Sequence, residues 1–350
     1  MVDNDFESEK KYAAAVALLM RRFEPRISKA FINALNQIKN SVPLEKITEL
    51  LQTARYGEII QLFDQDLTRA AFGEFTTALT NTYIEAGTAN AAMVPPITVT
   101  PKVPILGEIP TAMEVSVHFD VLNPAMIQSM QEYKLNLVQG LTSEVREAIR
   151  AEIFRALDKG MNPLDTARML RGMIGLTEHQ RNIIATYRSQ LESIGTDKQA
   201  VGTGPLKRLL RDKRSDNKIV RAIKNNEKLD AEYINNLVER YQNRFIQYRA
   251  QTIARTESIS LINKSNLQLW HNMVDEGIVS ENEIVRKWIY THDSKTRHAH
   301  RTIPSLNPDG VGLKEPFKSE LGLILYPGDP NVIAKNRVNC RCTIFMRLKY

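Results

Sequence analysis

Two short stretches near the end of the chain concentrate residue types that bind metals. THDSKTRHAHR, residues 291–301, holds three of the six histidines, and NRVNCRCT, residues 336–343, holds both cysteines. Two imidazole nitrogens and two thiolates form a ligand set typical of tetrahedral zinc. A zinc site is therefore one hypothesis for this part of the chain. Its candidate ligands are His298, His300, Cys340 and Cys342.

The spacing of the cysteines leaves a purely structural role open. Two to four residues usually separate paired cysteine ligands of zinc, whereas Arg341 alone separates Cys340 from Cys342. Side chains two positions apart on a strand point to opposite faces, so a turn would be needed to bring both thiols to one ion. The alternative is that the thiols pack in a short strand or turn, with His300 hydrogen-bonded nearby.

A metal-dependent nuclease or toxin-like enzyme is a further possibility. His298 and His300, together with Asp293, could activate a water molecule for hydrolysis. However, the end of the chain has no cluster of acidic residues of the kind that holds magnesium. The sequence also lacks a Walker loop, a dinucleotide-binding glycine fingerprint and a GxSxG elbow, which argues against ATP hydrolysis and acyl transfer. We expect a protein that is not an enzyme.

Basic residues concentrate between Lys207 and Lys228. This segment holds nine basic and three acidic residues, a local charge of +6 in a chain whose net charge is +7. Such a surface binds nucleic-acid phosphates whatever the base sequence, and the lack of aromatic residues argues against base stacking. A solvated helix face is the alternative. The candidate DNA-backbone contacts are Lys207, Arg208, Arg211, Lys213, Arg214, Lys218, Arg221 and Lys224.

The elements that must position these residues follow from composition and periodicity. With 350 residues, 43% hydrophobic and 25% charged, the chain is typical of a folded protein with two or three cores. Apolar residues recur at helical spacing, interrupted by a proline-rich stretch in which Val115, Val117 and Phe119 alternate with polar residues. We expect a mainly α fold with a short β arm near residues 97–120 and a small α+β module at the C-terminus. The expected segments are a helical domain (1–92), a proline-rich linker or β arm (93–122), a helical domain carrying the basic segment (123–280) and the α+β module (281–350).

Local signals place several boundaries. Pro25 and Pro43 are expected at helix boundaries, because proline is tolerated in a first turn and not in a helix interior. Thr177, followed three residues later by Gln180, predicts a capping box at a helix start. A long helical pattern covers about 230–275, and VRKWIY and CTIFMRL are typical of strands.

The chain gives no sign of a membrane or secreted protein. It has no apolar run near the roughly 20 residues of a membrane helix, and its first residues are acidic and polar rather than typical of a secretory signal. Two cysteines one residue apart offer no disulfide framework, which fits a reducing compartment. We expect a protein that acts in the cytoplasm, or in a particle assembled there, without membrane contact.

Five blocks occur in order between about residues 115 and 348. They are FDVLNP, GLTSEVREAIRAEIFRALDKGMNPLDTARMLRGMIGLTEHQ, RAQTIARTESISLINKSNLQLW, KWIYTHDSKTRHAH and VNCRCT. Together they resemble the minor head protein, or head morphogenesis, family of tailed bacteriophages. The residues that carry the resemblance most directly are Arg255, Thr256, Glu257, Asp293, Thr296, Arg297, His300, Asn339, Cys340, Arg341 and Cys342.

This resemblance implies a structural protein of the virion. It implies a minor capsid protein associated with the portal vertex that acts in head assembly, DNA packaging or DNA delivery. The implied partners are the portal protein, other capsid proteins and the phage double-stranded DNA. The implied location is the head interior or the portal vertex, with the host cytoplasm as the site of assembly.

Overall fold

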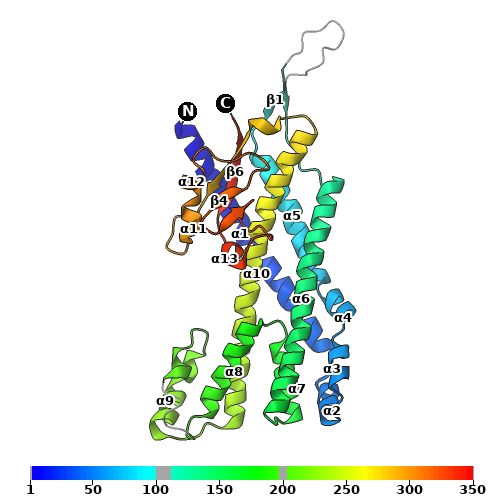
Figure 1. Cartoon of the computed structure of the whole chain (residues 1–350), viewed down its shortest axis with the longest axis vertical. Helices are drawn as coiled ribbons and strands as arrows, with labels where there is room; N and C mark the ends of the chain where they lie inside the picture. Colours follow the sequence, from blue (N-terminus) through cyan, green and yellow to red (C-terminus); the bar gives the residue numbers. More distant parts are fainter. Residues whose placement is uncertain (1, 100–111, 197–202, 350) are drawn as a thin grey trace. The chain divides into compact units, whose positions relative to one another are not determined.

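The computed structural model describes residues 2–99, 112–196 and 203–349 of a mainly helical protein (Figure 1). Helices make up 67% of it and the strands are few and short, which confirms the expected mainly α fold with a small α+β module. None of the helices in these three ranges combines the length and apolar character of a membrane span. The α-helices are α1 (Val2–Ser41), α2 (Leu44–Gln52), α3 (Tyr56–Leu62), α4 (Gln65–Ala71), α5 (Gly73–Met93), α6 (Pro124–Asp158), α7 (Pro163–Met173), α8 (Glu178–Glu192), α9 (Asp216–Asn225), α10 (Ala231–Asp275), α11 (His298–Arg301), α12 (Ile303–Leu306) and α13 (Ala334–Arg337).

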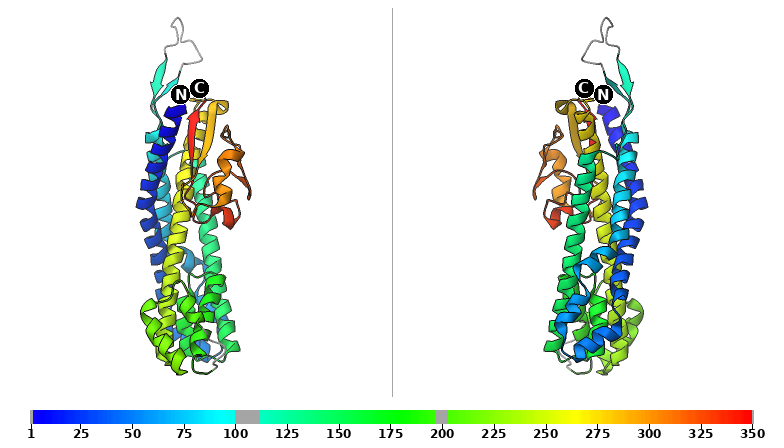
Figure 2. Two further views of the ribbon diagram at one scale, coloured as in Figure 1. Left: turned by 90° about the vertical axis from the view of Figure 1, so that its left-hand side faces the viewer. Right: turned by 90° about the vertical axis from the view of Figure 1, so that its right-hand side faces the viewer.

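The strands form antiparallel pairs. The sequences expected to be strands pair with each other, in a register that runs from Ile284 opposite Leu348 to Ile289 opposite Thr343. Figure 2 shows these two strands side by side, the second of them in red. The pairs are β1 (Ile97–Val99) with β2 (Met113–Val115), β3 (Ile284–Ile289) with β6 (Thr343–Leu348), and β4 (Phe317–Ser319) with β5 (Gly322–Ile324). Short 3-10 turns are η1 (Gly204–Lys207), η2 (Lys213–Ser215) and η3 (Glu281–Glu283).

Contacts divide the chain into two units that are each discontinuous in sequence. Unit 1 comprises Met1–Lys29, Phe75–Lys134 and Gln251–Tyr350, and unit 2 comprises Ala30–Glu74 and Leu135–Ala250. This division differs from the four consecutive segments expected from the sequence. The reason is that α1, α6 and α10 each contribute residues to both units.

The β arm of unit 1 is anchored on α5. β1 and β2 form its paired base, whereas residues 100–111 of the expected arm lie outside the described residues. The expected alternation is present here, because Val117 and Phe119 are buried and His118 between them is exposed. The ring of Phe119 occupies the space that a Cβ atom at Gly87 would need, at 2.2 Å. Only glycine at this position of α5 lets the ring approach so closely.

The C-terminal module of unit 1 is organised around a buried arginine. Arg286, on β3, is fully buried. Its guanidinium donates hydrogen bonds to the carbonyl oxygens of Gly312 (2.8 Å), Leu325 (2.7 Å) and Glu315. Because a buried guanidinium must have its donors satisfied, these bonds fix the loop of residues 311–325 against the strand.

Capping residues fix the starts of two helices of unit 2, α7 and α8. The predicted capping box at the start of α8 is confirmed, because the side chain of Thr177 accepts from the backbone N–H of Gln180, and the Gln180 side chain accepts from that of Thr177. At the start of α7, Asn162 caps the first turn and Pro163 occupies it, where no backbone N–H is required. These caps set the ends of the helices that line the cavity described below.

The prediction of a helix boundary at Pro25 is wrong. Pro25 lies inside α1, which continues to Ser41. Phe23 and Ile27, on either side of the proline, are fully buried. Their burial offsets the loss of one helical hydrogen bond, which costs about 3 kcal/mol or more. Pro43 does stand at a boundary, directly before α2.

Candidate metal centre

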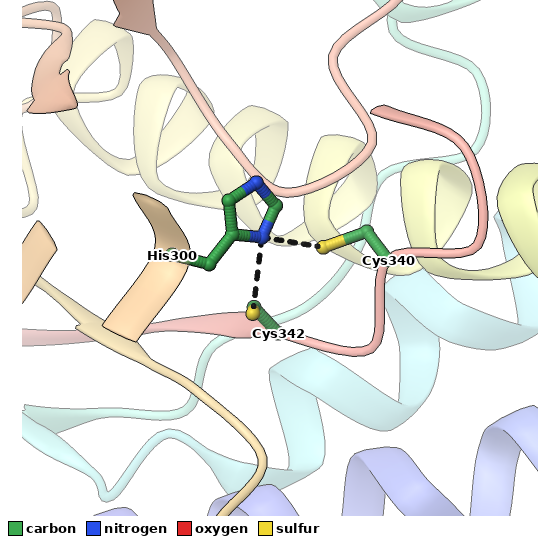
Figure 3. A group of neighbouring side chains, drawn as sticks. All are labelled: His300, Cys340 and Cys342. Atoms are coloured by element: carbon green, nitrogen blue, oxygen red, sulfur yellow. Dashed lines mark hydrogen bonds between the residues drawn. The ribbon is translucent and has the colours of Figure 1, made fainter. Parts of the chain in front are cut away.

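A buried histidine and two buried cysteines meet in the C-terminal module. His300 lies on α11, whereas Cys340 and Cys342 lie on the segment that joins α13 to β6. The Nδ1 atom of His300 is 3.5 Å from the Sγ atom of each cysteine, as the dashed lines in Figure 3 show. The three ligand atoms lie within 4.8 Å of one another, so this group could hold a metal ion.

The separation of these atoms fits zinc. Zinc–nitrogen bonds of about 2.0–2.1 Å and zinc–sulfur bonds of about 2.3 Å, at a tetrahedral angle, place nitrogen and sulfur roughly 3.5 Å apart. The two 3.5 Å separations between His300 Nδ1 and the sulfur atoms agree with this value. The histidine and cysteines therefore need no large movement to share one ion.

A turn solves the problem of the single-residue spacing. Asn339 has a φ of +58°, in the left-handed region that asparagine tolerates better than most residues. The backbone N–H of Cys340 then bonds to the carbonyl oxygen of Arg337, 3.2 Å away. Because Cys340 and Cys342 both precede β6, they do not alternate across a strand and can face the same histidine.

The far side of the His300 ring is also fixed. Its Nε2 atom lies 2.6 Å from Oδ1 of Asn336, on α13. With an N–H at Nε2 that donates to this oxygen, Nδ1 presents its lone pair to the sulfur atoms. The ring of Trp288 stands edge-on to the imidazole, with the ring centres 5.4 Å apart. Metal-binding histidines are typically held by a second hydrogen bond of this kind.

The two thiols are not equivalent. A hydrogen bond from Cys342, followed by that of His300, holds the pKa of Cys340 well below its usual range, although burial acts in the opposite direction. The hydrogen bond to Cys340 and burial raise the pKa of Cys342 well above its usual range. The two shifts favour a thiolate at Cys340 over one at Cys342, and a bound cation would favour the thiolate form of both.

His298 is not part of this group. Its side chain is 80% exposed and its Nδ1 atom lies 3.1 Å from a carboxylate oxygen of Glu320. His298 and His300 are two positions apart on a helical turn, so they project in different directions. The four-ligand set expected from the sequence is therefore reduced to three protein ligands.

Asp293 is engaged elsewhere. Its carboxylate lies 2.7 Å from the guanidinium of Arg341 and accepts from the backbone N–H groups of Lys295 and Thr296, each at 3.0 Å. The hydrogen bond from Arg341 lowers the pKa of Asp293 to about 2. Among the described residues no carboxylate joins the histidine and the cysteines, so the three residues considered for a nuclease are not gathered at one point.

The other residues of the resemblance tie the two halves of the module together. The guanidinium of Arg297 donates to the carbonyl oxygen of Val338, and the hydroxyl of Thr296 donates to that of Thr291 at 2.5 Å. With the Asp293–Arg341 ion pair, these bonds join residues 291–301 to the turn that carries the cysteines. The two stretches therefore hold each other in place within the module.

Helix α10 contributes a buried polar face to the same module. The hydroxyl of Thr256 accepts from the backbone N–H of Asn339 at 3.0 Å. The carboxylate of Glu257 lies 2.7 Å from the guanidinium of Arg337 and accepts a hydrogen bond from the hydroxyl of Tyr133. Burial raises the pKa of Glu257, although Arg337 acts in the opposite direction. Thr256 and Glu257, two residues that carry the resemblance, thus connect α10 to the C-terminal module.

Arg255 points away from the module to α1, where its Nε atom lies 3.5 Å from a carboxylate oxygen of Glu24.

Three residues that contact the site, Asn336, Arg337 and Tyr133, were not predicted from the sequence. The first two stand directly before the cysteine motif, so proximity is a signal that would have included them. Tyr133 lies 124 residues from Glu257 on another helix, and no pattern in the sequence links the two.

Three arginines of the basic segment are engaged with other side chains of unit 2. Arg208 donates to the side-chain oxygen Oε1 of Gln190 at 3.0 Å, and Arg211 pairs with Asp216 at 2.8 Å. Arg214 pairs with Asp212, which also holds two arginines of α10. These arginines, foremost Arg214, lower the pKa of Asp212. Part of the positive charge is therefore compensated within the fold.

The remaining basic candidates are exposed. Lys218, on α9, lies over the ring of Tyr233, with its Nζ atom 3.7 Å from the ring centre. Arg221 and Lys224 follow at intervals of three residues on the same helix, so they share a side with Lys218. The other two exposed candidates are Lys207 and Lys213.

Comparison of the chain with protein-family models, curated proteins and solved structures finds no match. What the protein does is therefore inferred from the sequence blocks and from the geometry of the His–Cys–Cys group.

Proposed function

We propose that this protein is a minor head protein of a tailed bacteriophage, which acts at the portal vertex in head assembly, DNA packaging or DNA delivery. The proposal rests on five sequence blocks that occur in the order typical of the head morphogenesis family. One structural observation carries it further. Residues from three of these blocks share a hydrogen-bonded network around His300, Cys340 and Cys342. Such a network supports a structural brace rather than a site of turnover, because its polar groups bind one another.

Zinc is the ion we propose for this group. Nitrogen and sulfur ligands in tetrahedral arrangement favour zinc over magnesium or calcium. His300, Cys340 and Cys342 would hold it, and the fourth position would be filled by water or by a residue of a partner. When bound, the ion would supply a cross-link between α11 and the segment before β6, two parts of the module that are distant in sequence.

Contact with the phage double-stranded DNA would come from the exposed part of the basic segment. Lys207, Lys213, Arg221 and Lys224 are exposed, and no ion pair within the described part of unit 2 involves them. Binding through such side chains would not depend on base sequence and would weaken as the salt concentration rises. The portal protein and neighbouring capsid proteins would be the other partners.

The decisive experiment is quantitative mass spectrometry of purified phage heads. We expect this chain in a few copies per head, and we expect it to co-purify with the portal ring when the heads are dissociated. Its absence from heads that contain the portal and major capsid proteins would refute the proposal.

A second experiment addresses the enzymatic alternative. The purified chain is incubated with duplex DNA and Mg²⁺, Mn²⁺ or Zn²⁺, and the His300→Ala variant is treated in the same way. We expect no cleavage by either protein. Metal-dependent cleavage that the variant loses would favour a nuclease.

A further inference from the structure

A polar cavity of about 430 Å³ lies within unit 2, lined by residues of α1, α2, α7, α8 and α10. Ligand-binding pockets typically have volumes of about 300–1,000 Å³. None of its described lining residues belongs to the basic segment 207–228 or to the His–Cys–Cys group. The cavity is therefore separate from both features on which the proposed function depends.

The wall of this cavity carries more positive than negative charge. Four cationic and two acidic side chains line it. One of the acids is already engaged, because the carboxylate of Asp165 lies 3.5 Å from the guanidinium of Arg168. Arg188 pairs with Glu192, which is not among the described lining residues, at 3.4 Å. Lys39 and Arg171 are thus left with Glu239 as the one remaining carboxylate of the described lining. The charged lining residues are Lys39, Arg168, Arg171, Arg188, Asp165 and Glu239.

The excess of positive charge in the cavity affects the pKa of Lys39. Burial, and next the positive charge of Arg171, lower the pKa of Lys39 to about 8, against the opposing effect of Glu239. Within the part of the chain that the structure describes, no carboxylate comes within ion-pair distance of its ammonium group. An anion in the cavity would relieve the repulsion between Lys39 and Arg171.

The two nearby guanidinium groups retain unused donors. Arg171 makes one long hydrogen bond, from Nη2 to Oδ1 of Asn40 at 3.3 Å. The Nη1 atom of Arg188 donates to the side-chain oxygen of Asn235 at 2.8 Å and lies 3.4 Å from a carboxylate oxygen of Glu192. Its Nε atom is buried and finds no acceptor among the described residues. A buried donor without a protein acceptor is uncommon in a folded protein, and a ligand oxygen in the cavity would satisfy it.

We infer that this cavity binds a phosphate group, with Lys39, Arg171 and Arg188 as its ligands. Arginine and lysine together match the charge and the several acceptor oxygens of a phosphate. No aromatic side chain is among the described lining residues, so the wall offers no platform for a base. The site would recognise the phosphate itself, whether free as a small phosphate anion or as part of a nucleic-acid backbone.

Isothermal titration of the full-length chain with sodium pyrophosphate, at low ionic strength and pH 7.5, tests this inference. We expect saturable binding at one site per chain. Arg171→Gln and Lys39→Gln should each weaken it at least about tenfold, the usual effect of losing a charge-assisted hydrogen bond. Arg171→Lys should retain part of the affinity. Circular dichroism and thermal unfolding identify any variant that does not fold, and the other substitution then serves as the test.

The matched control is Lys224→Gln, which removes one positive charge from an exposed position of unit 2 outside the cavity. It should leave pyrophosphate binding unchanged. Absence of pyrophosphate binding by the wild type, or an equal loss in the Lys224→Gln variant, would overturn the inference.

A short DNA duplex distinguishes the sources of the phosphate. If the duplex competes with pyrophosphate and Arg171→Gln weakens both, the site takes a backbone phosphate. If pyrophosphate binds without competition, the site takes a small anion. Either result can occur whether or not the chain is a virion protein, so failure here is distinguishable from failure of the proposed function.

Discussion

The backbone N–H of Asn339 donates to the side-chain oxygen of Thr256, 3.0 Å away, across 83 residues of sequence. Asn339 is also the residue whose left-handed backbone turns the chain toward the cysteines. A side chain of α10 therefore fixes the turn on which the candidate metal centre depends.

Replacing Thr256 with valine should loosen this turn. Valine keeps the shape of threonine but offers no acceptor, so we expect the free energy of unfolding in urea to fall by about 1 kcal/mol. Zinc affinity should fall with it. The matched control is Thr186→Val on α8, because the Thr186 hydroxyl bonds only within its own helix, to the carbonyl oxygen of Asn182. Equal losses of unfolding free energy in the two variants would show that the hydrogen bond between Thr256 and Asn339 contributes no more to stability than a bond within one helix.

The metal content of the purified protein tests the ligand set. We expect inductively coupled plasma mass spectrometry to detect about one zinc ion per chain in the wild type. Cys342→Ala or His300→Ala should abolish it, because each removes one of the three ligands. His298→Ala should retain it, since His298 points to Glu320 instead. A wild-type protein without metal, or a Cys342→Ala variant that keeps it, would contradict the assignment.

The buried pair of Glu257 and Arg337 should show strong coupling. Arg337→Met leaves a buried carboxylate with Tyr133 as its remaining partner, and we expect a loss of about 3 kcal/mol in the free energy of unfolding. Adding Glu257→Gln should recover part of this loss, because the unpaired charge is gone. Lys314 and Glu281 form an ion pair of similar length, 2.6 Å, on the surface. Lys314→Met should have a much smaller effect, and equal effects would argue against a role for burial.

Glu152, on α6, should make unit 2 sensitive to pH. Its side chain is fully buried beside Arg155, and burial raises its pKa above the usual 4.5, against the effect of Arg155. As the pH rises above 4.5, the Glu152 carboxyl loses its proton in the unfolded chain before it does so in the folded chain. The free energy of unfolding therefore falls as the pH rises through the folded pKa. Glu152→Gln lacks this titration. Its free energy of unfolding, relative to wild type, should therefore increase between pH 4.5 and 7.5.

Urea denaturation at several pH values measures this difference. Glu232→Gln, at an exposed position of α10, serves as the control. A constant offset between wild type and Glu152→Gln across this range would contradict the prediction.

Local chemistry explains which parts of the fold could be predicted. The capping box at Thr177 and the strands β3 and β6 depend on neighbouring residues or on simple burial, and these elements were predicted, although the pairing of the two strands was not. Pro25 was misjudged because buried neighbours on α1 outweigh its cost. The discontinuous units were not foreseen, since helices as long as α10 have no sequence signal that marks where one set of contacts ends and another begins.

The candidate site was foreseen in part for the same reason. Residue types singled out His300, Cys340 and Cys342, but the helical turn that sends His298 to the surface was not considered. The cavity in unit 2 has no motif, because its cationic residues come from three helices, α1, α7 and α8.

Asn263 on α10 determines which alignment the last strand can adopt. Its amide donates to the carbonyl oxygens of Ile259 and Pro327, and its oxygen accepts from the Thr343 hydroxyl and the Ile344 backbone N–H. If β6 slipped by one residue, these buried donors and acceptors would no longer meet, and every side chain of the strand would change face. The side-chain amide of Asn263 thus fixes the register of β6 and disfavours misaligned forms of the module during folding.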